Sequence, residues 1–306
     1  MPYSLPHDRL KSTESSRPLG AILYLLRSHR DDIGHLSRSL RALKQNVLSS
    51  NPYPVLCFHE SSLLNDVPLH KLLLATCAAS GVPVFLHLVN FSFPRAQAER
   101  MWAKDVEPVI FRSGKHWPMG YRHMCRFFSG PFAFHPALLE YGWAWRMDTD
   151  SEVTRPIEND QIGLLRNAGA LYGCVGQDRE RLSVAARFEN ATLEYFGHNF
   201  SRSVLGVRFA KDYFGRLPTF ASNMEIISLE WVRSTAFMNF FDFLDRQGGF
   251  YLYRWGDALT RWFAVKLLRA EHVRPLNITY VHGSTGEGRK EQVHVDDGAW
   301  KRREVK

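Results

Sequence analysis

Cysteine is scarce in this chain, and long apolar runs are missing. Only four of the 306 residues are cysteines, and no two of them form a C-x-x-C pair; they are Cys57, Cys77, Cys125 and Cys174. The spacing excludes a zinc ribbon or a thioredoxin-type site and leaves one or two disulfides open. No apolar run reaches the roughly 20 residues that a membrane span requires. Residues 1–18 are polar and contain three prolines, so we expect a flexible N-terminus there rather than a signal peptide.

The chain also lacks the extreme composition that marks disordered or strongly nucleic-acid-binding proteins. Hydrophobic residues make up 45% and charged residues 23%, which is ordinary for a soluble globular protein. The 39 Lys and Arg exceed the 31 Asp and Glu, giving a formal charge of +8 that suits an anionic ligand. Outside a basic tail at 291–306, basic residues are spread among acidic ones, so we expect no nucleic-acid partner. Four N-x-[ST] sequons hint at a secretory relative.

Strands and helices alternate along the chain. Apolar runs predict strands at 20–26, 54–58, 83–89 and 143–147. Apolar residues spaced by three and four from Ile33 to Val47 predict a helix that Asp31 and Asp32 can cap, and a second helix is expected at 69–79. This order predicts an α/β fold with a mainly parallel sheet, in one domain over residues 19–290. Ligands bind such sheets at the carboxyl ends of the strands. Further helices are expected at 228–247 and 257–268, and a strand at 277–281 ends in His282.

The sharpest local signal is Asp148-Thr149-Asp150, directly after the apolar strand 143–147. Two carboxylates one residue apart at a strand end can share a divalent cation, and such hard oxygen ligands suit Mg²⁺ or Mn²⁺ bound to a diphosphate. A solvated turn is the structural alternative. A haloacid-dehalogenase phosphatase is disfavoured because its motif opens the domain and needs Thr or Val where Glu152 stands.

Longer blocks of sequence follow one another in a recognisable order. They are Tyr121-Arg122-His123-Met124-Cys125-Arg126-Phe127 with Ser129-Gly130, Trp145-Arg146 ahead of the acid pair, Asn223-Met224-Glu225-Ile226, Gly248-Gly249-Phe250, Arg254-Trp255-Gly256-Asp257-Ala258, and the strand that ends at Tyr280 and His282. On these blocks, from about Arg27 to His282, the chain resembles the fungal α-1,2-mannosyltransferases of glycosyltransferase family 15.

The resemblance implies a single GT-A-like (Rossmann-like) nucleotide-sugar-binding domain that transfers mannose from GDP-mannose with retention of configuration. It implies Mn²⁺, with Mg²⁺ as an alternative, and a mannose-containing glycan or glycoprotein acceptor joined in α-1,2 linkage. The family usually has Glu-Pro-Asp at the acid motif, and this chain keeps two carboxylates there. The implied catalytic acids are Glu225 and Asp257, the metal ligands are Asp148, Asp150 and His282, and the donor contacts are Arg27, Tyr121, Arg126, Asp148 and Asp150.

Each of these roles has a structural alternative. Glu225 suits a capping residue ahead of a helix beginning near Ser228, Asp257 suits an N-cap, and a lone histidine such as His282 more often satisfies a structural hydrogen bond. At the level of function, the alternatives are a glycosyltransferase with another nucleotide-sugar donor and a non-catalytic glycan- or nucleotide-binding protein of the same fold. The family resemblance also implies a Golgi or other secretory location, although this sequence carries no recognisable signal or anchor.

Overall fold

The computed structural model describes residues 19–93, 118–181, 184–197, 216–269, 273–283 and 290–292. The expected flexible segment 1–18 lies outside these residues, as does most of the expected tail at 291–306. The last described strand, β12, covers Lys290–Gln292 and crosses the boundary expected at residue 290.

A seven-stranded sheet forms the centre of the molecule, in the order β10-β6-β9-β4-β1-β2-β3. The strands are β1 Gly20–Leu26, β2 Val55–His59, β3 Val84–Leu88, β4 Trp143–Met147, β6 Tyr172–Cys174, β9 Met224–Ser228 and β10 Val273–Pro275. Every neighbouring pair is parallel except those of β9, which runs antiparallel to both β4 and β6. The predicted α/β fold with a mainly parallel sheet is confirmed.

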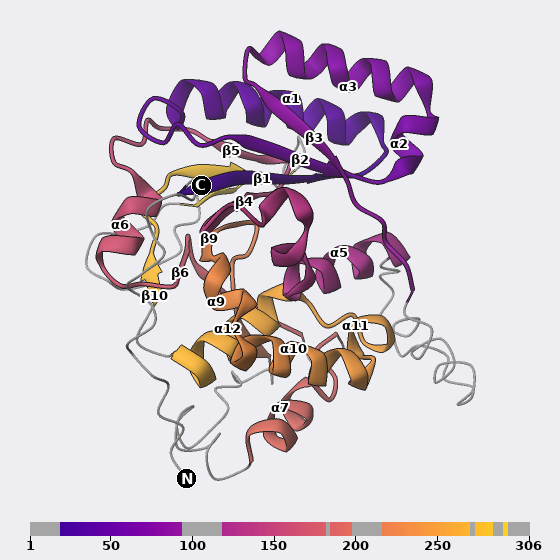
Figure 1. The fold of residues 1–306 in the computed structure, drawn as a ribbon, viewed down its shortest axis with the longest axis vertical. Coiled ribbons are helices and arrows are strands. Elements are labelled where there is room, and N and C mark those ends of the chain that lie inside the picture. Colours follow the sequence, from indigo (N-terminus) through magenta and orange to yellow (C-terminus); the bar gives the residue numbers. More distant parts are fainter. Residues whose placement is uncertain are drawn as a thin grey trace.

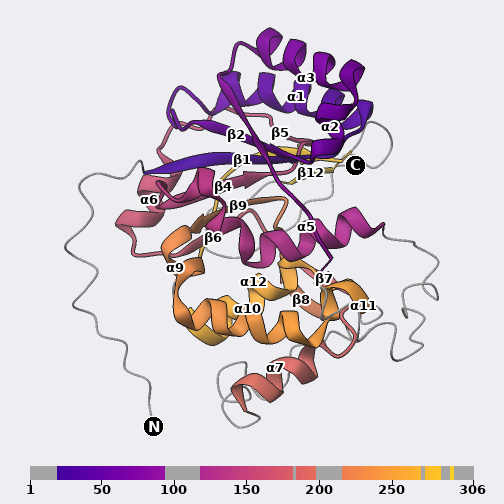
Figure 2. The same ribbon diagram turned by 45° about the vertical axis from the view of Figure 1, so that its right-hand side comes forward.

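Helices cover both faces of this sheet (Figures 1 and 2). One face carries α1 Arg30–Asn46 and α3 Val67–Ser80, with the short α2 Ser61–Asn65 beside them. The other face carries α5 Met119–Ser129, α9 Leu229–Arg233, α10 Thr235–Gln247 and α12 Asp257–Arg269. Strand β1 is buried from both sides, so Ile22 packs in the core under α1 while Leu23 packs in the core above α12. Burial on both faces explains why β1 is a continuous apolar run.

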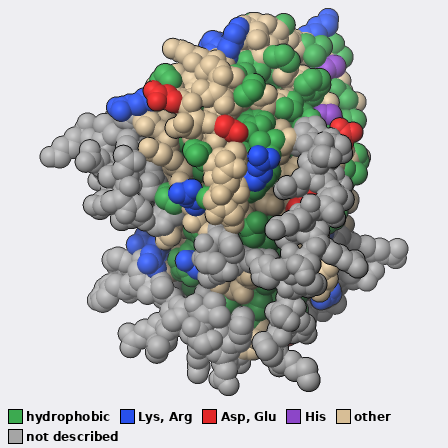
Figure 3. Space-filling view, turned by 60° about the vertical axis from the view of Figure 1, so that its left-hand side comes forward, with side chains coloured by type: hydrophobic (Ala, Val, Ile, Leu, Met, Phe, Trp, Pro, Cys, Tyr) green, Lys and Arg blue, Asp and Glu red, His purple; other side chains and the backbone are tan. Residues whose placement is uncertain are grey.

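Smaller elements complete the fold. A three-stranded sheet has the order β12-β11-β5, and a two-stranded sheet joins β7 to β8. The remaining elements are β5 Ser151–Val153, β7 Gln177–Glu180, β8 Leu217–Phe220, β11 Tyr280–His282, α6 Gln161–Asn167, α7 Phe188–Phe196, α11 Gly249–Leu252 and the 3₁₀ turns Pro131–Phe134 and Pro136–Leu138. No described helix is long and apolar enough to cross a membrane. Figure 3 shows Lys and Arg side chains scattered over one face of the described residues.

Two predicted elements differ from the structure, and the open cysteine question is answered. The helix expected over 228–247 is two helices, because Ser234 is extended (φ −63°, ψ 146°) and its side chain caps α10. Ser228 belongs to β9 and caps α9 in the same way. The strand expected at 277–281 is β11, shifted to Tyr280–His282. All four cysteines are described and unpaired.

Candidate active site

The acid motif lies in the turn that leaves the carboxyl end of β4. Backbone hydrogen bonds fix this turn: the Asp148 amide donates to the Asn223 carbonyl at 3.0 Å, and the Ser151 amide donates to the Asp148 carbonyl at 2.9 Å. The chain then continues into β5, which pairs antiparallel with β11 so that Ser151 faces His282. A residue 132 positions after Asp150 is therefore held beside the acid motif by strand pairing.

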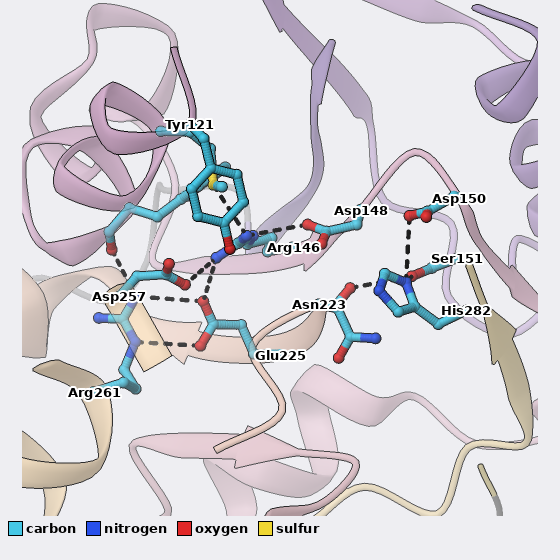
Figure 4. Close-up of polar contacts among 12 residues, drawn as sticks. Tyr121, Arg146, Asp148, Asp150, Ser151, Asn223, Glu225, Asp257, Arg261 and His282 are labelled. Atoms are coloured by element: carbon cyan, nitrogen blue, oxygen red, sulfur yellow. Dashed lines mark hydrogen bonds and ion pairs between the residues drawn. The ribbon is translucent and has the colours of Figure 1, made fainter. Parts of the chain in front are cut away.

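Asp148, Asp150 and His282 form one cluster of ligand-type atoms. One such atom from each residue lies within 4.8 Å of the other two, and all three side chains are partly exposed. His282 Nδ1 is 3.3 Å from Asp150 Oδ1 and 3.2 Å from the Ser151 hydroxyl (Figure 4). Burial raises the pKa of Asp148, while Arg146 and His282 oppose the shift and the neighbouring Asp150 and Asp257 add to it. Two carboxylates and an imidazole at this spacing match the ligand types that Mn²⁺ accepts.

A second, buried group of charges lies behind this cluster. Arg146 of β4 stands opposite Glu225 of β9 in the antiparallel register, and Asp257 begins α12. Arg146 donates to Asp257 Oδ2 and, at 3.1 Å, to Asp148 Oδ1, and it lies 3.7 Å from Glu225. Burial alone would raise the pKa of Asp257, but Arg146 and a hydrogen bond from Ser222 hold it below its ordinary value. Asp257 is thus an ion-paired acid near the candidate metal site.

Glu225 is 1% exposed, and both of its oxygens have partners. Oε2 accepts from the Tyr172 hydroxyl at 2.8 Å and from Arg261 Nε at 3.2 Å, and Oε1 accepts from Arg261 Nη2 at 3.3 Å. Arg261 stands one helical turn after Asp257 in α12, which brings both side chains to the same helix face. Glu225 therefore does not cap a helix, and Ser228 fills that role.

Tyr121 and Arg27 are the two predicted donor contacts that lie near the acids. The Tyr121 hydroxyl accepts from Arg254 Nη1 at 3.2 Å, and burial raises the pKa of this tyrosine. Arg27 follows β1, and its guanidinium binds both oxygens of Asp32 at 2.6 and 2.8 Å. A groove of about 620 Å³ runs from Arg27 along α1. The charge of Asp150 acts on Arg27, and those of Asp148 and Asp257 act on Tyr121, so both residues lie near the acids, and their contact with a donor stays a prediction.

Arg126 is held elsewhere. Its guanidinium binds both oxygens of Asp245 on α10, at 2.7 and 2.8 Å. It also lines a pocket of about 230 Å³ together with His123 and Tyr251. None of these contacts joins it to the acid cluster within the described residues, so its role as a donor contact stays a prediction.

The sequence reasoning assigned no role to Arg146, Arg261 or Tyr172. For two of them, Arg146 and Arg261, the sequence contained a sign of a role in the site. Arg146 is a charge inside the apolar run of β4, between Trp145 and Met147, and a buried charge needs partners. Arg261 follows Asp257 by four residues in a predicted helix, which is the spacing of an ion-pair neighbour. Tyr172 carried no such sign, because only the pairing of β6 with β9 brings it to Glu225.

Comparison with known sequences finds relatives along almost the whole chain. The family described as glycolipid 2-alpha-mannosyltransferase matches residues 4–297. The "Glycolipid 2-alpha-mannosyltransferase" of Saccharomyces cerevisiae is 28% identical over 271 residues, which cover 84% of this chain and 58% of that protein. The "O-glycoside alpha-1,2-mannosyltransferase homolog 2" of Schizosaccharomyces pombe is 34% identical, with 85% of this chain and 72% of that protein covered. The chain thus spans a little over half the length of the budding-yeast relative.

Solved structures share the fold. Core-mannan synthase A from Aspergillus fumigatus, in its Mn/GDP form, superposes with a TM-score of 0.73 at 21% identity, covering 96% of this chain and 82% of that one. The mannosyltransferase Ktr4p from S. cerevisiae, in complex with GDP, gives a TM-score of 0.68 at 20% identity over 91% of this chain and 72% of that one. The fold is therefore GT-A-like, as the family resemblance implied.

Proposed function

The chain belongs to the glycolipid 2-alpha-mannosyltransferase family, and from this membership we propose that it is a retaining mannosyltransferase. The donor in this proposal is GDP-mannose, and the acceptor is a mannose-containing glycan or glycoprotein that receives mannose in α-1,2 linkage. By family, the proposed location is the Golgi or another secretory compartment.

The observation that carries the proposal is the cluster of Asp148, Asp150 and His282 beside the buried acids Glu225 and Asp257. Across both groups, two guanidinium groups face four carboxylates, a formal charge of −2 that a divalent cation would balance. The set of metal-ligand atoms and the charge thus both fit Mn²⁺, held by Asp148, Asp150 and His282. Bound there, the cation would neutralise negative charge on the diphosphate leaving group.

The names of the relatives support the choice of donor and linkage. The two relatives described above are called 2-alpha- and alpha-1,2-mannosyltransferases. The structural neighbours carry GDP, one of them together with Mn. GDP is the nucleotide that would remain after mannose leaves GDP-mannose.

In the proposed mechanism, Glu225 supplies negative charge near the anomeric carbon, where positive charge develops in the transition state. Its oxygens already accept three hydrogen bonds, which favours an electrostatic role over a nucleophilic one. The leaving diphosphate can take the proton of the acceptor hydroxyl in a same-face transfer, so no separate base is required. Asp257 helps fix the acceptor, and Arg27 and Tyr121 contact the donor.

A donor screen tests the proposal. The protein is incubated with Mn²⁺, a mannoside acceptor and each of several nucleotide sugars, and sugar transfer and donor hydrolysis are scored. GDP-mannose should give the highest transfer rate. A higher rate with a uridine-diphosphate sugar would contradict GDP-mannose as the donor. Binding without turnover for every donor would favour the non-catalytic alternative.

A further inference from the structure

Arg146 joins the two charged groups of the site (Figure 4). Its Nη1 donates to Asp257 Oδ2 and lies 3.7 Å from Glu225 Oε1, while its Nη2 donates to Asp148 Oδ1 at 3.1 Å. One planar guanidinium thus contacts an acid of the exposed cluster and both acids of the buried group.

The surroundings of Arg146 leave its side chain little freedom. The side chain is 4% exposed and belongs to the penultimate residue of β4, opposite Glu225 in the strand register. The ring of Phe128 stacks on the guanidinium, with 3.8 Å between Cζ and the ring centroid, and Nη2 lies 3.6 Å from the sulfur of Met124. A guanidinium held this way presents its two Nη atoms in fixed directions.

Hydrogen-bond donors in fixed positions matter for a carboxylate that binds a metal, because they hold the carboxylate in one orientation. Arg146 donates to Oδ1 of Asp148, which restricts rotation of that carboxylate and so sets the orientation of the proposed ligand. Partners of this kind, which touch the ligand rather than the metal, typically change metal affinity by about 10–100-fold when they are removed. Because the same guanidinium also binds Asp257, a substitution at Asp257 is expected to move the guanidinium and thereby change the orientation of the Asp148 carboxylate.

We propose that Arg146 is a positioning residue that orients Asp148 for the metal and couples this orientation to Asp257. The inference rests on the proposed function, since it takes Asp148 as a metal ligand. This positioning role differs from a role in which Arg146 only balances the charge of the buried acids. A charge-balancing role needs only one positive charge at position 146, whereas positioning needs two donors at fixed separation.

The substitution Arg146→Lys separates these roles, because it keeps the positive charge and loses the forked donor. Mn²⁺ affinity is measured on the folded protein by titration followed by electron paramagnetic resonance, for the wild type, Arg146→Lys, Asp257→Asn and the double variant. Arg233→Lys is the matched control, since the guanidinium of Arg233 binds backbone carbonyls of Ala133, Leu138 and Tyr141.

Positioning predicts that Arg146→Lys weakens Mn²⁺ binding about 10-fold or more, while Arg233→Lys leaves it within about 2-fold of the wild type. It also predicts that Asp257→Asn weakens binding in the wild-type background and has a smaller effect in the Arg146→Lys background, because the link between the two acids is already lost there. A direct Coulomb effect of Asp257 would be the same in both backgrounds, since both carry the same charge at position 146.

Wild-type Mn²⁺ affinity in folded Arg146→Lys, or additive effects in the double variant, would overturn the proposal. If Arg146→Lys does not fold, Asp257→Glu takes its place, because it keeps the negative charge and moves the carboxylate that Arg146 binds. Weakened Mn²⁺ affinity in Asp257→Glu supports the proposal, and wild-type affinity overturns it. A wild-type protein that binds no Mn²⁺ contradicts the proposed metal-dependent function itself, so the two failures are distinguishable.

Discussion

Glu225 is a carboxylate that the fold has removed from water and surrounded with hydrogen-bond donors. Its partners are Arg261, the Tyr172 hydroxyl and, at 3.7 Å, Arg146. Burying a charge is costly unless it is paired and hydrogen-bonded, and this pairing meets the condition. A carboxylate fixed in this way provides charge without needing to reorganise during the reaction, which is what electrostatic catalysis requires.

We expect Glu225→Gln to lower the transfer rate by about 10²-fold or more, equivalent to about 2.7 kcal/mol of transition-state stabilisation. Glutamine has nearly the same shape and keeps an acceptor oxygen, but it removes the charge. Affinity for GDP-mannose should stay near the wild-type value, because the groups proposed to contact metal and diphosphate are unchanged. Steady-state kinetics and donor titration on the folded variant measure both quantities.

Tyr172→Phe is the control, since it removes one hydrogen bond to Glu225 and leaves the charge in place. It should cost about 1 kcal/mol of stability and reduce the rate less than the glutamine variant does. Near-normal turnover in Glu225→Gln would exclude an essential role for that charge in catalysis.

Asp257 gives a pH-dependent prediction about stability. Its pKa in the folded protein lies below the ordinary value, so the unfolded chain binds the proton more readily. The stabilisation by this carboxylate is therefore present above its ordinary pKa of about 3.9 and is lost as the pH falls through the lower folded value. In denaturant titrations, the wild type should exceed Asp257→Asn in unfolding free energy at pH 7, and the difference should narrow below about pH 4. A difference that stays constant from pH 7 to pH 3 would contradict the assigned ion pair.

At the scale of elements, the loop before α12 depends on a close approach between Gly249 and Trp255. A Cβ added to Gly249 would overlap the indole ring of Trp255, which is 1% exposed. The indole Nε1 also donates to the Ala186 carbonyl at 2.8 Å. Two sequence blocks that carried the family resemblance therefore pack against each other, immediately ahead of Asp257.

Gly249→Ala should destabilise the protein by about 1–3 kcal/mol through overpacking and should also lower activity, because Trp255 must move. Gly34→Ala is the matched control: nothing lies within 4 Å of an added Cβ there, and alanine stabilises a helix interior by up to about 1 kcal/mol. Thermal melting of both variants measures the difference. Equal melting temperatures for Gly249→Ala and Gly34→Ala would mean that the loop before α12 accommodates the added methyl group without strain.

The sequence predicted strands of five or more mostly apolar residues, as in β1, β2, β3 and β4, and it missed the shorter buried strands β6 and β8. It missed β9, a short run interrupted by Glu225, because a charged residue in a buried strand is explained only by the partners that the fold brings to it. It joined α9 and α10 because the apolar spacing continues across Ser234, whose extended backbone breaks the helix. It grouped Asp148, Asp150 and His282 only through the family resemblance, since local patterns do not reveal which strand pairs with β5.

At the scale of the whole molecule, the site draws on distant parts of the chain. Arg27 follows β1, Asp148 and Asp150 follow β4, Asp257 begins α12, and His282 ends β11. The ends of β1 and β4 meet because the two strands are parallel neighbours in the sheet. A ligand that touches all these segments would bind only the folded chain and would stabilise it as a whole.

GDP-mannose with Mn²⁺ should therefore raise the melting temperature more than UDP-glucose or UDP-galactose does. A ligand at about 100 times its dissociation constant adds about 2.7 kcal/mol to the unfolding free energy. Thermal denaturation with equal concentrations of each donor, with and without metal, measures the effect. Greater protection by a uridine-diphosphate sugar would contradict the proposed donor.

The most direct test of the central claim is the initial rate of mannose transfer from GDP-mannose to a mannoside acceptor, measured against Mn²⁺ concentration for the wild type and Asp150→Asn. The wild-type rate should vanish in excess chelator and return with Mn²⁺, and the product should carry an α-1,2 linkage. Asp150→Asn should remain folded and require far more Mn²⁺, or show no turnover. Full wild-type activity in excess chelator, or a normal Mn²⁺ requirement in Asp150→Asn, would contradict a metal-dependent transferase built on this cluster.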